Sequence, residues 1–271
     1  MKVAAVQMVS ATSVAANLAA ARTLLEQAAA QGAELAVLPE YFCLLGRRDT
    51  DKLQVQEAFG SGPIQDFLAA SARELNLWIA GGTLPLSTDD PARVRNSLLV
   101  FNPQGQCAAR YDKIHLFRFD NGTERYDETR VLQAGSEPVL LDVTSRSGDV
   151  FRVGLSVCYD LRFPELYRHY AAAGAHLLLA PSAFTHTTGQ AHWELLLRTR
   201  AVENLAFVVA AAQGGTHENG RRTWGQSMVV DPWGRVLAQQ AEGPGVVLAE
   251  ASLASLQQRR TQLPALEHRV L

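Results

Sequence analysis

The chain has 271 residues, of which 25 are Lys or Arg and 27 are Asp or Glu, so its formal net charge is −2. Because nucleic-acid-binding proteins usually carry a basic excess or patch, this near balance gives no general electrostatic case for a nucleic-acid partner. Apolar residues make up 47% of the chain and charged residues 19%, which is typical of a globular domain and not of a disordered one.

Short apolar runs suited to strands alternate with stretches of helical periodicity along the chain. We expect strands at residues 3–8, 35–40, 77–83, 96–101, 108–111, 139–143, 151–157, 176–180, 207–212, 228–230, 235–238 and 246–249. We expect helices at residues 17–31, 62–75, 165–173, 190–204 and 253–262. Residues 120–133 are polar and irregular and predict a long surface loop. Strand–helix alternation without a Pro/Gly/Ser-rich linker predicts an α/β fold in one domain spanning 1–271.

The cysteine and histidine patterns exclude several classes of site. The three cysteines are Cys43, Cys107 and Cys158, and no CxxC pair occurs, so a disulfide framework or a zinc ribbon is not expected. The seven histidines form no HxxxH or HxH pair, so no metal site is expected. The N-terminus lacks a signal-peptide layout and no apolar run approaches about 20 residues, so we expect a cytoplasmic protein without a membrane partner.

Three chemically capable side chains end or follow predicted strands. Glu40 ends the 35–40 strand, Lys113 comes after the 108–111 strand and Cys158 after the 151–157 strand. Ligands of open α/β sheets bind beyond the carboxyl ends of strands, so these side chains could converge on one pocket. A free thiol is mostly protonated at neutral pH and needs a base or a cation to become a nucleophile. A carboxylate base, a compact ammonium and a thiol together describe acyl transfer.

Two alternatives compete with a cysteine enzyme. The string GLSVC at residues 154–158 is close to a G-x-S-x-G nucleophile elbow, which would make Ser156 the nucleophile. However, Cys158 stands where that elbow needs its second glycine. The second alternative is an interaction module without catalysis on the same scaffold. Glu40, Lys113 and Cys158 argue against it, because such a module needs none of the three.

Three strings resemble the signature segments of the nitrilase superfamily of carbon–nitrogen hydrolases: LPE at 38–40, YDKIHL at 111–116 and CYDLRFPE at 158–165. The resemblance implies a four-layer α-β-β-α sandwich, no metal or organic cofactor, and a homodimer or a higher assembly. It implies that Glu40 is the general base, Lys113 the oxyanion-binding cation and Cys158 the nucleophile. It also implies a second pocket glutamate, for which Glu128 is the match and Glu124 the competing choice.

Further strings resemble the Nit-type amidases of that superfamily: PSAF at 181–184, AHWE at 191–194, LRTRAVEN at 197–204 and SMVVDPWG at 227–234. This branch implies a small-molecule substrate, the amide of a carboxylated 2-oxo acid, hydrolysed through a thioester. Deaminated glutathione, giving 2-oxoglutarate and Cys-Gly, is the expected substrate, and 2-oxoglutaramate is the alternative.

Five residues are expected to contact the substrate. The backbone N–H of Tyr159 would help to hold the oxyanion. The planar fork of Arg162 suits a substrate carboxylate, although it could equally brace the loop after the cysteine. Phe184, Thr185 and Trp193 are expected to line the pocket, although an aromatic residue at helical spacing is often part of the core.

Overall fold

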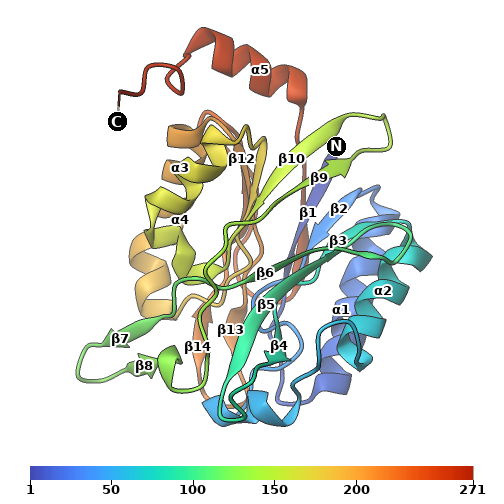
Figure 1. The fold of residues 1–271 in the computed structure, drawn as a ribbon, viewed down its shortest axis with the longest axis vertical. Coiled ribbons are helices and arrows are strands. Elements are labelled where there is room, and N and C mark those ends of the chain that lie inside the picture. The colour runs from blue at the N-terminus through green and yellow to red at the C-terminus, as the bar shows by residue number, and fades with distance from the viewer. Residues whose placement is uncertain (271) are drawn as a thin grey trace.

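Two β-sheets stacked face to face form the centre of the computed structural model, which describes residues 1–270 (Figure 1). The strands of the first sheet are β1 (Lys2–Gln7), β2 (Leu35–Val37), β3 (Trp78–Ala80), β4 (Leu84–Ser87), β5 (Val94–Phe101), β6 (Cys107–Asp112) and β17 (Gly245–Glu250). Their order is β17-β1-β2-β3-β5-β4, and β6 also pairs with β5. The central strands β1, β2 and β3 are parallel.

The second sheet repeats the parallel centre with antiparallel edges. Its strands are β9 (Leu140–Thr144), β10 (Val150–Leu155), β11 (Leu177–Leu179), β12 (Phe207–Ala210), β15 (Ser227–Val230) and β16 (Val236–Gln240). Their order is β16-β15-β12-β11-β10-β9, in which β10, β11 and β12 are parallel. The remaining strands form two separate two-stranded antiparallel sheets. One pairs β7 (Arg118–Asp120) with β8 (Arg125–Asp127), and the other pairs β13 (Gly214–Thr216) with β14 (Arg222–Trp224).

Helices cover the outer faces of both sheets, which confirms the predicted α-β-β-α sandwich (Figure 1). The helices are α1 (Val14–Ala30) and α2 (Pro63–Leu75) on the first sheet, α3 (Pro164–Ala172) and α4 (His186–Asn204) on the second, and α5 (Leu253–Gln262) at one end. Three short 3-10 helices lie between them: η1 (Asp49–Gln54), η2 (Glu128–Arg130) and η3 (Cys158–Arg162).

The side chains of β1 point alternately to the two faces of the first sheet, and both faces are covered. Val3 and Ala5 belong to the cluster that includes the second sheet, whereas Ala4 and Val6 belong to the cluster with α1 and α2. Successive side chains of a strand point to opposite faces, so an entirely apolar strand must be covered on both sides. The first sheet is therefore buried between helices and another sheet.

The structure differs from the expectations in several elements. Residues 120–133 are not an irregular loop, because β7 and β8 form a hairpin that η2 follows. Helix α4 begins at His186, one turn before the expected start, because the Thr185 hydroxyl caps it by accepting from the N–H of Thr188. The short strands β4, β13 and β14 were not predicted, since runs of three or four residues give little periodic signal.

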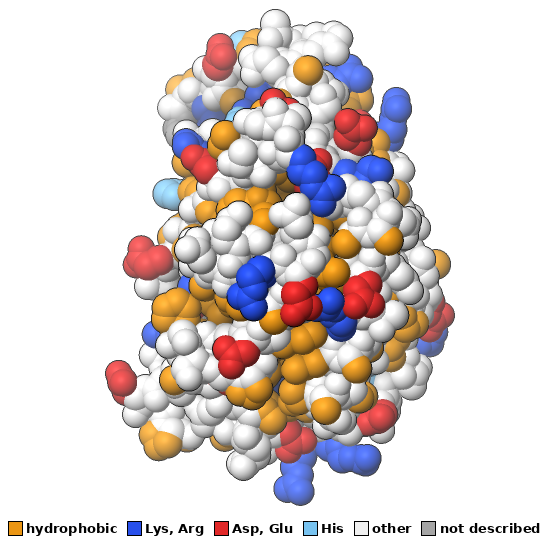
Figure 2. All heavy atoms as spheres, turned by 90° about the vertical axis from the view of Figure 1, so that its right-hand side faces the viewer, with side chains coloured by type: hydrophobic (Ala, Val, Ile, Leu, Met, Phe, Trp, Pro, Cys, Tyr) orange, Lys and Arg blue, Asp and Glu red, His pale blue; other side chains and the backbone are white. Residues whose placement is uncertain are grey.

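The surface mixes charges of both signs on the face that Figure 2 shows, over α1 and α2. Arg22 of α1 pairs there with Glu26 and with Glu74 of α2. Among residues 1–270, none of the helices combines the length and the apolar character that crossing a bilayer requires.

Leu25 tests the packing of α1 on the first sheet, because its side chain is fully buried. We expect Leu25→Ala to lower the free energy of unfolding by about 2–5 kcal/mol, through lost burial and the cavity that remains. Urea unfolding measures the change, with the exposed Leu263→Ala as control. A loss below about 1 kcal/mol for Leu25→Ala would contradict the buried position.

Candidate active site

The three predicted catalytic side chains meet between the two sheets. Glu40 follows β2 and Lys113 follows β6 in the first sheet, and Cys158 follows β10 in the second. The Nζ atom of Lys113 lies 2.8 Å from Oε1 of Glu40, and Glu40 and Cys158 line the same pocket. The fold therefore brings together three residues that lie far apart in the sequence.

Lys113 lies between two carboxylates. Its Nζ atom is 2.8 Å from Oε1 of Glu40 and 2.8 Å from Oε2 of Glu128, and its side chain is fully buried. Burial alone opposes the charge, but the carboxylates of Glu128 and Glu40 raise the pKa of Lys113 above its ordinary value. Burial likewise opposes the charge of Glu128. The ammonium of Lys113 lowers the pKa of Glu128, and so do the hydrogen bonds that its carboxylate accepts from the Phe117 N–H and the Tyr41 hydroxyl. Lys113 is thus held as a cation.

Glu40 is oriented by three donors. The Nδ2 atom of Asn96 donates to its Oε1 at 2.9 Å, and the backbone N–H of Ala183 donates to its Oε2 at 3.0 Å. Lys113 is the third donor. These bonds fix the carboxylate beside Cys158, where a general base for the thiol must lie.

Cys158 lies in an unusual backbone conformation at the start of η3. Its φ angle is +51°, in the left-handed region that residues other than glycine rarely adopt. Its N–H donates to the carbonyl of Pro181 at 3.0 Å. Burial raises the pKa of the Cys158 thiol well above its ordinary value, Glu40 raises it further and Lys113 lowers it. These shifts favour the protonated thiol, so Cys158 would need a base to become a nucleophile.

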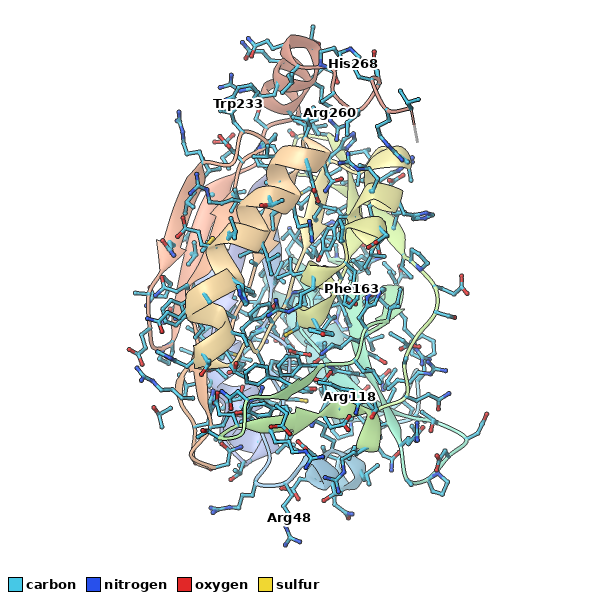
Figure 3. The ribbon with its side chains drawn as sticks, turned by 90° about the vertical axis from the view of Figure 1, so that its left-hand side faces the viewer. Arg48, Arg118, Phe163, Trp233, Arg260 and His268 are labelled. Carbon is cyan, nitrogen blue, oxygen red and sulfur yellow. The ribbon has the colours of Figure 1, made fainter. Side chains whose placement is uncertain are left out.

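Asp160 braces the turn that carries the cysteine, a role that sequence reasoning missed. Its buried carboxylate accepts from the hydroxyl of Tyr111 at 2.7 Å, from Val157 N–H at 2.8 Å and from His115 N–H at 3.0 Å. Phe163, labelled in Figure 3, stacks on the ring of His115 with centroids 3.6 Å apart. The signal was present, because Asp160 lies within the CYDLRFPE string.

Asn96, Tyr41 and Arg221 were also missed. Asn96 lies mid-strand on β5 and Arg221 in the turn between β13 and β14, so neither is in a string that marks it. Tyr41 directly follows Glu40, and its hydroxyl donates to Oε1 of Glu128 at 2.7 Å. Only the folded chain shows these contacts.

A small pocket adjoins the thiol. Its free space is about 10 Å³, room for about one water molecule. The lining residues are Glu40, Phe117, Glu128, Cys158, Tyr159, Arg162, Ala183, Phe184, Thr185, Thr188 and Arg221. Among residues 1–270, no group of three or more His, Cys, Asp or Glu side chains is arranged to hold a metal ion.

The pocket contains four of the five residues expected to contact the substrate, namely Tyr159, Arg162, Phe184 and Thr185. Trp193 is the exception, and the expectation that it lines the pocket is wrong. Its ring packs behind Phe184, with centroids 5.0 Å apart, and its Nε1–H donates to the carbonyl of Gln226. Trp193 is therefore part of the buried core.

Arg162 does not pair with an acidic residue among residues 1–270. Its guanidinium lies over the rings of Tyr159 and Phe184, at 5.7 and 5.6 Å from their centroids, and near Nδ1 of His192 at 3.3 Å. Stacking holds the fork in the pocket and leaves its charge uncompensated by a carboxylate.

The contacts distinguish Glu128 from Glu124 as the second pocket glutamate, and they place Ser156 away from the pocket. Glu128 reaches Lys113, whereas Glu124 lies on the hairpin and accepts from the hydroxyl of Thr187 at 2.7 Å. Ser156 is buried and its hydroxyl contacts Tyr167 and the carbonyl of Leu179, so it does not face the pocket.

The comparisons with known proteins agree with this geometry. The family model described as carbon-nitrogen hydrolase matches residues 2–261. A deaminated glutathione amidase of Synechocystis sp. is 40% identical over 270 residues, which is 98% of this chain and 97% of the relative. A chloroplastic omega-amidase of Arabidopsis thaliana is 38% identical over 252 residues, covering 92% of this chain and 66% of the relative.

A solved structure shares the fold over the whole chain. Saccharomyces cerevisiae Nit3, a member of branch 10 of the nitrilase superfamily, superimposes with a TM-score of 0.88 at 29% identity, covering 100% of this chain and 97% of Nit3. Since the family model spans almost all of the sequence and the relatives match along nearly its full length, the chain belongs to the carbon-nitrogen hydrolase family, in its Nit-type amidase branch.

Proposed function

We propose that this amidase hydrolyses deaminated glutathione to 2-oxoglutarate and Cys-Gly. The observation that carries the proposal is one pocket lined by the thiol of Cys158, the oriented carboxylate of Glu40 and the guanidinium of Arg162, which has no acidic partner among residues 1–270. Arg162 would bind the carboxylate of the 2-oxo acid through two parallel hydrogen bonds. The relatives named deaminated glutathione amidase support this substrate.

The first half-reaction forms a thioester. Glu40 takes the thiol proton as the sulfur of Cys158 attacks the amide carbonyl. Lys113 and the backbone N–H of Tyr159 hold the oxyanion, and losing one such donor typically raises the barrier by about 3 kcal/mol. Collapse breaks the C–N bond while Glu40 returns its proton to the leaving amine, so that Cys-Gly departs.

The second half-reaction consumes water. Glu40 takes a proton from a water molecule that attacks the thioester carbonyl, and the same two donors hold the second oxyanion. The thiolate leaves and takes its proton back from Glu40, which restores the starting state. Glu128 supports both steps by holding Lys113 in place and charged.

The alternative amide is 2-oxoglutaramate, whose hydrolysis would release ammonia through the same steps. The relative named omega-amidase favours it. The buried contacts of Ser156 argue against a serine nucleophile, and an interaction module without catalysis has no use for the oriented Glu40.

We further propose that residues 1–271 act as a single domain in the reducing cytoplasm. The core clusters extend across both sheets, and Cys43, Cys107 and Cys158 are all free thiols, as a reducing compartment would leave them.

We also propose that two copies associate through the outer face of α4. Leu195 is 66% exposed and Val202 46% exposed on this helix, next to Trp233, which is 49% exposed. They line a shallow cleft of about 580 Å³. Large apolar side chains gathered on one face commonly mark an interface.

Cys158→Ala tests the nucleophile. We expect it to lower the hydrolysis of deaminated glutathione, measured as Cys-Gly release, by about a thousandfold or more, because no thioester can form. Far-UV circular dichroism should stay unchanged. Cys107→Ala, at an exposed cysteine outside the pocket, is the matched control and should keep wild-type turnover. Wild-type turnover in Cys158→Ala, with a loss in Ser156→Ala, would overturn the assignment.

Lys113→Met tests the buried charges. It leaves the carboxylates of Glu40 and Glu128 without their cation, so we expect a loss of about 3–5 kcal/mol in unfolding free energy at pH 7. Lys2→Met at the surface is the control.

The stability loss caused by Lys113→Met should depend on pH. In the wild type the pKa of Glu128 is lowered, so its contribution is present above the ordinary value of 4.5 and is lost as the pH falls through the lowered value. Without Lys113, burial raises that pKa, so the variant loses stability as the pH rises. Urea unfolding between pH 4 and pH 8 should show the penalty shrinking toward acid, and a constant penalty would contradict the ion pairs.

Leu195→Glu tests self-association. A charge in the centre of the α4 face should dissociate the dimer, because burying an unpaired carboxylate is costly. Sedimentation velocity at micromolar concentration should show a wild-type dimer and a monomeric variant, with Leu263→Glu near α5 remaining dimeric. A monomeric wild type, or a dimeric Leu195→Glu, would rule out this interface.

A further inference from the structure

A second arginine lines the catalytic pocket and has no role in the steps above. Arg221 lies in the turn between β13 and β14 and shares the pocket with Cys158. Its Nη2 atom donates to the carbonyl of Ala183 at 3.1 Å, and its guanidinium lies 5.0 Å from the ring centroid of Tyr126. These contacts hold the side chain but do not use all of its donors.

One buried donor of Arg221 lacks an acceptor. Its Nε–H is buried without a hydrogen-bond partner, and no carboxylate pairs with the guanidinium among residues 1–270. Buried donors in folded proteins are normally satisfied, so an orphaned one at a pocket wall calls for an explanation. A carboxylate on a ligand would supply both the acceptor and the negative charge.

Arg221 also lines a second, larger space. This basic cleft has a volume of about 460 Å³, against about 10 Å³ for the catalytic pocket. Five of its lining residues are basic and one is acidic: Arg47, Arg48, Lys52, Arg125 and Arg221, with Asp49. Arg48, which lines this cleft, lies at the lower end of the molecule in Figure 3. Arg221 therefore lines both the catalytic pocket and the larger basic cleft.

We propose that Arg221 and the basic cleft form the subsite for the leaving group, and that Arg221 binds its terminal carboxylate. This inference rests on the proposed function. The acyl part stays on Cys158, beside Arg162. The departing amine of a dipeptide, which spans about 7 Å from its nitrogen to its carboxylate, needs space that the catalytic pocket lacks.

The subsite separates the two candidate substrates. Deaminated glutathione carries a glycine carboxylate on its leaving group, whereas 2-oxoglutaramate releases only ammonia and has nothing for Arg221 to bind. Arg221 is therefore a residue that selects an amide with an anionic peptide leaving group. The carboxylate would occupy the free Nε–H together with an Nη donor in the side-on geometry that guanidinium groups favour.

The experiment compares two substrates that differ only at the far end of the leaving group. These are deaminated glutathione and its C-terminal glycinamide, both of which keep the 2-oxo acid. The readout is the ratio of their kcat/KM values in the wild type, in Arg221→Gln and in Arg152→Gln. Arg152 pairs with Asp142 on the second sheet, away from both pockets, and serves as the matched control. A general loss caused by disturbing the Ala183 contact divides out of the ratio.

We expect the wild type and Arg152→Gln to prefer the free carboxylate by about tenfold to a hundredfold, the range of a hydrogen-bonded charge pair. In Arg221→Gln the ratio should fall close to one. A wild type that hydrolyses both substrates equally, or an Arg221→Gln that keeps the wild-type ratio, overturns the leaving-group subsite while the proposed function stands. A wild type that hydrolyses neither substrate overturns the proposed function itself.

A measurement on the wild type alone keeps the test decisive if Arg221→Gln does not fold. Raising NaCl from about 50 mM to about 500 mM should lower the preference for the free carboxylate at least threefold, because salt screens the charges of a partly open cleft. The carboxylate of the 2-oxo acid is common to both substrates and cancels. A preference that does not change with salt overturns the electrostatic subsite.

Discussion

A single buried ammonium, that of Lys113, is the interaction on which the site depends. Taking one charge out of water is expensive, and the cost is met only when counter-charges and hydrogen bonds are in place. Glu40 and Glu128 supply both, at 2.8 Å each. The three groups are stable only together, so β2, β6 and the start of η2 must be held at fixed separations. The stacked sheets provide that rigidity.

The same charges set the reactivity of the cysteine. Burial and Glu40 keep the thiol of Cys158 protonated, while Lys113 acts in the opposite direction. In the proposed mechanism, the resting site therefore holds no thiolate, and the nucleophile forms only when Glu40 takes the proton. The left-handed turn at Cys158 and the bonds to Asp160 aim the sulfur into the pocket. The strained backbone at Cys158 is held in place by its surroundings.

In the proposed scheme, the residues that bind the substrate come from other parts of the fold than the three catalytic groups. Phe117, which precedes the β7–β8 hairpin, packs on Tyr159 with ring centroids 5.2 Å apart, and Glu124 of the hairpin accepts from Thr187 at the start of α4. Arg162 is held by stacked rings and Arg221 by a backbone carbonyl. Two guanidinium groups without acidic partners thus line one pocket, and in the proposed scheme they bind the two carboxylates of one substrate.

The sequence by itself determined the α/β class, because strand and helix periodicity are short-range signals. Its local strings made Glu40, Lys113 and Cys158 candidates, and their resemblance to a known family implied the sandwich. It did not determine the hairpin at residues 118–127, whose polar three-residue strands carry no periodic pattern. Trp193 has the same helical spacing whether it faces a pocket or the core, and only packing against Phe184 decided which. The contacts of Asn96 and Arg221 join segments far apart in the chain, so tertiary structure alone placed them at the site.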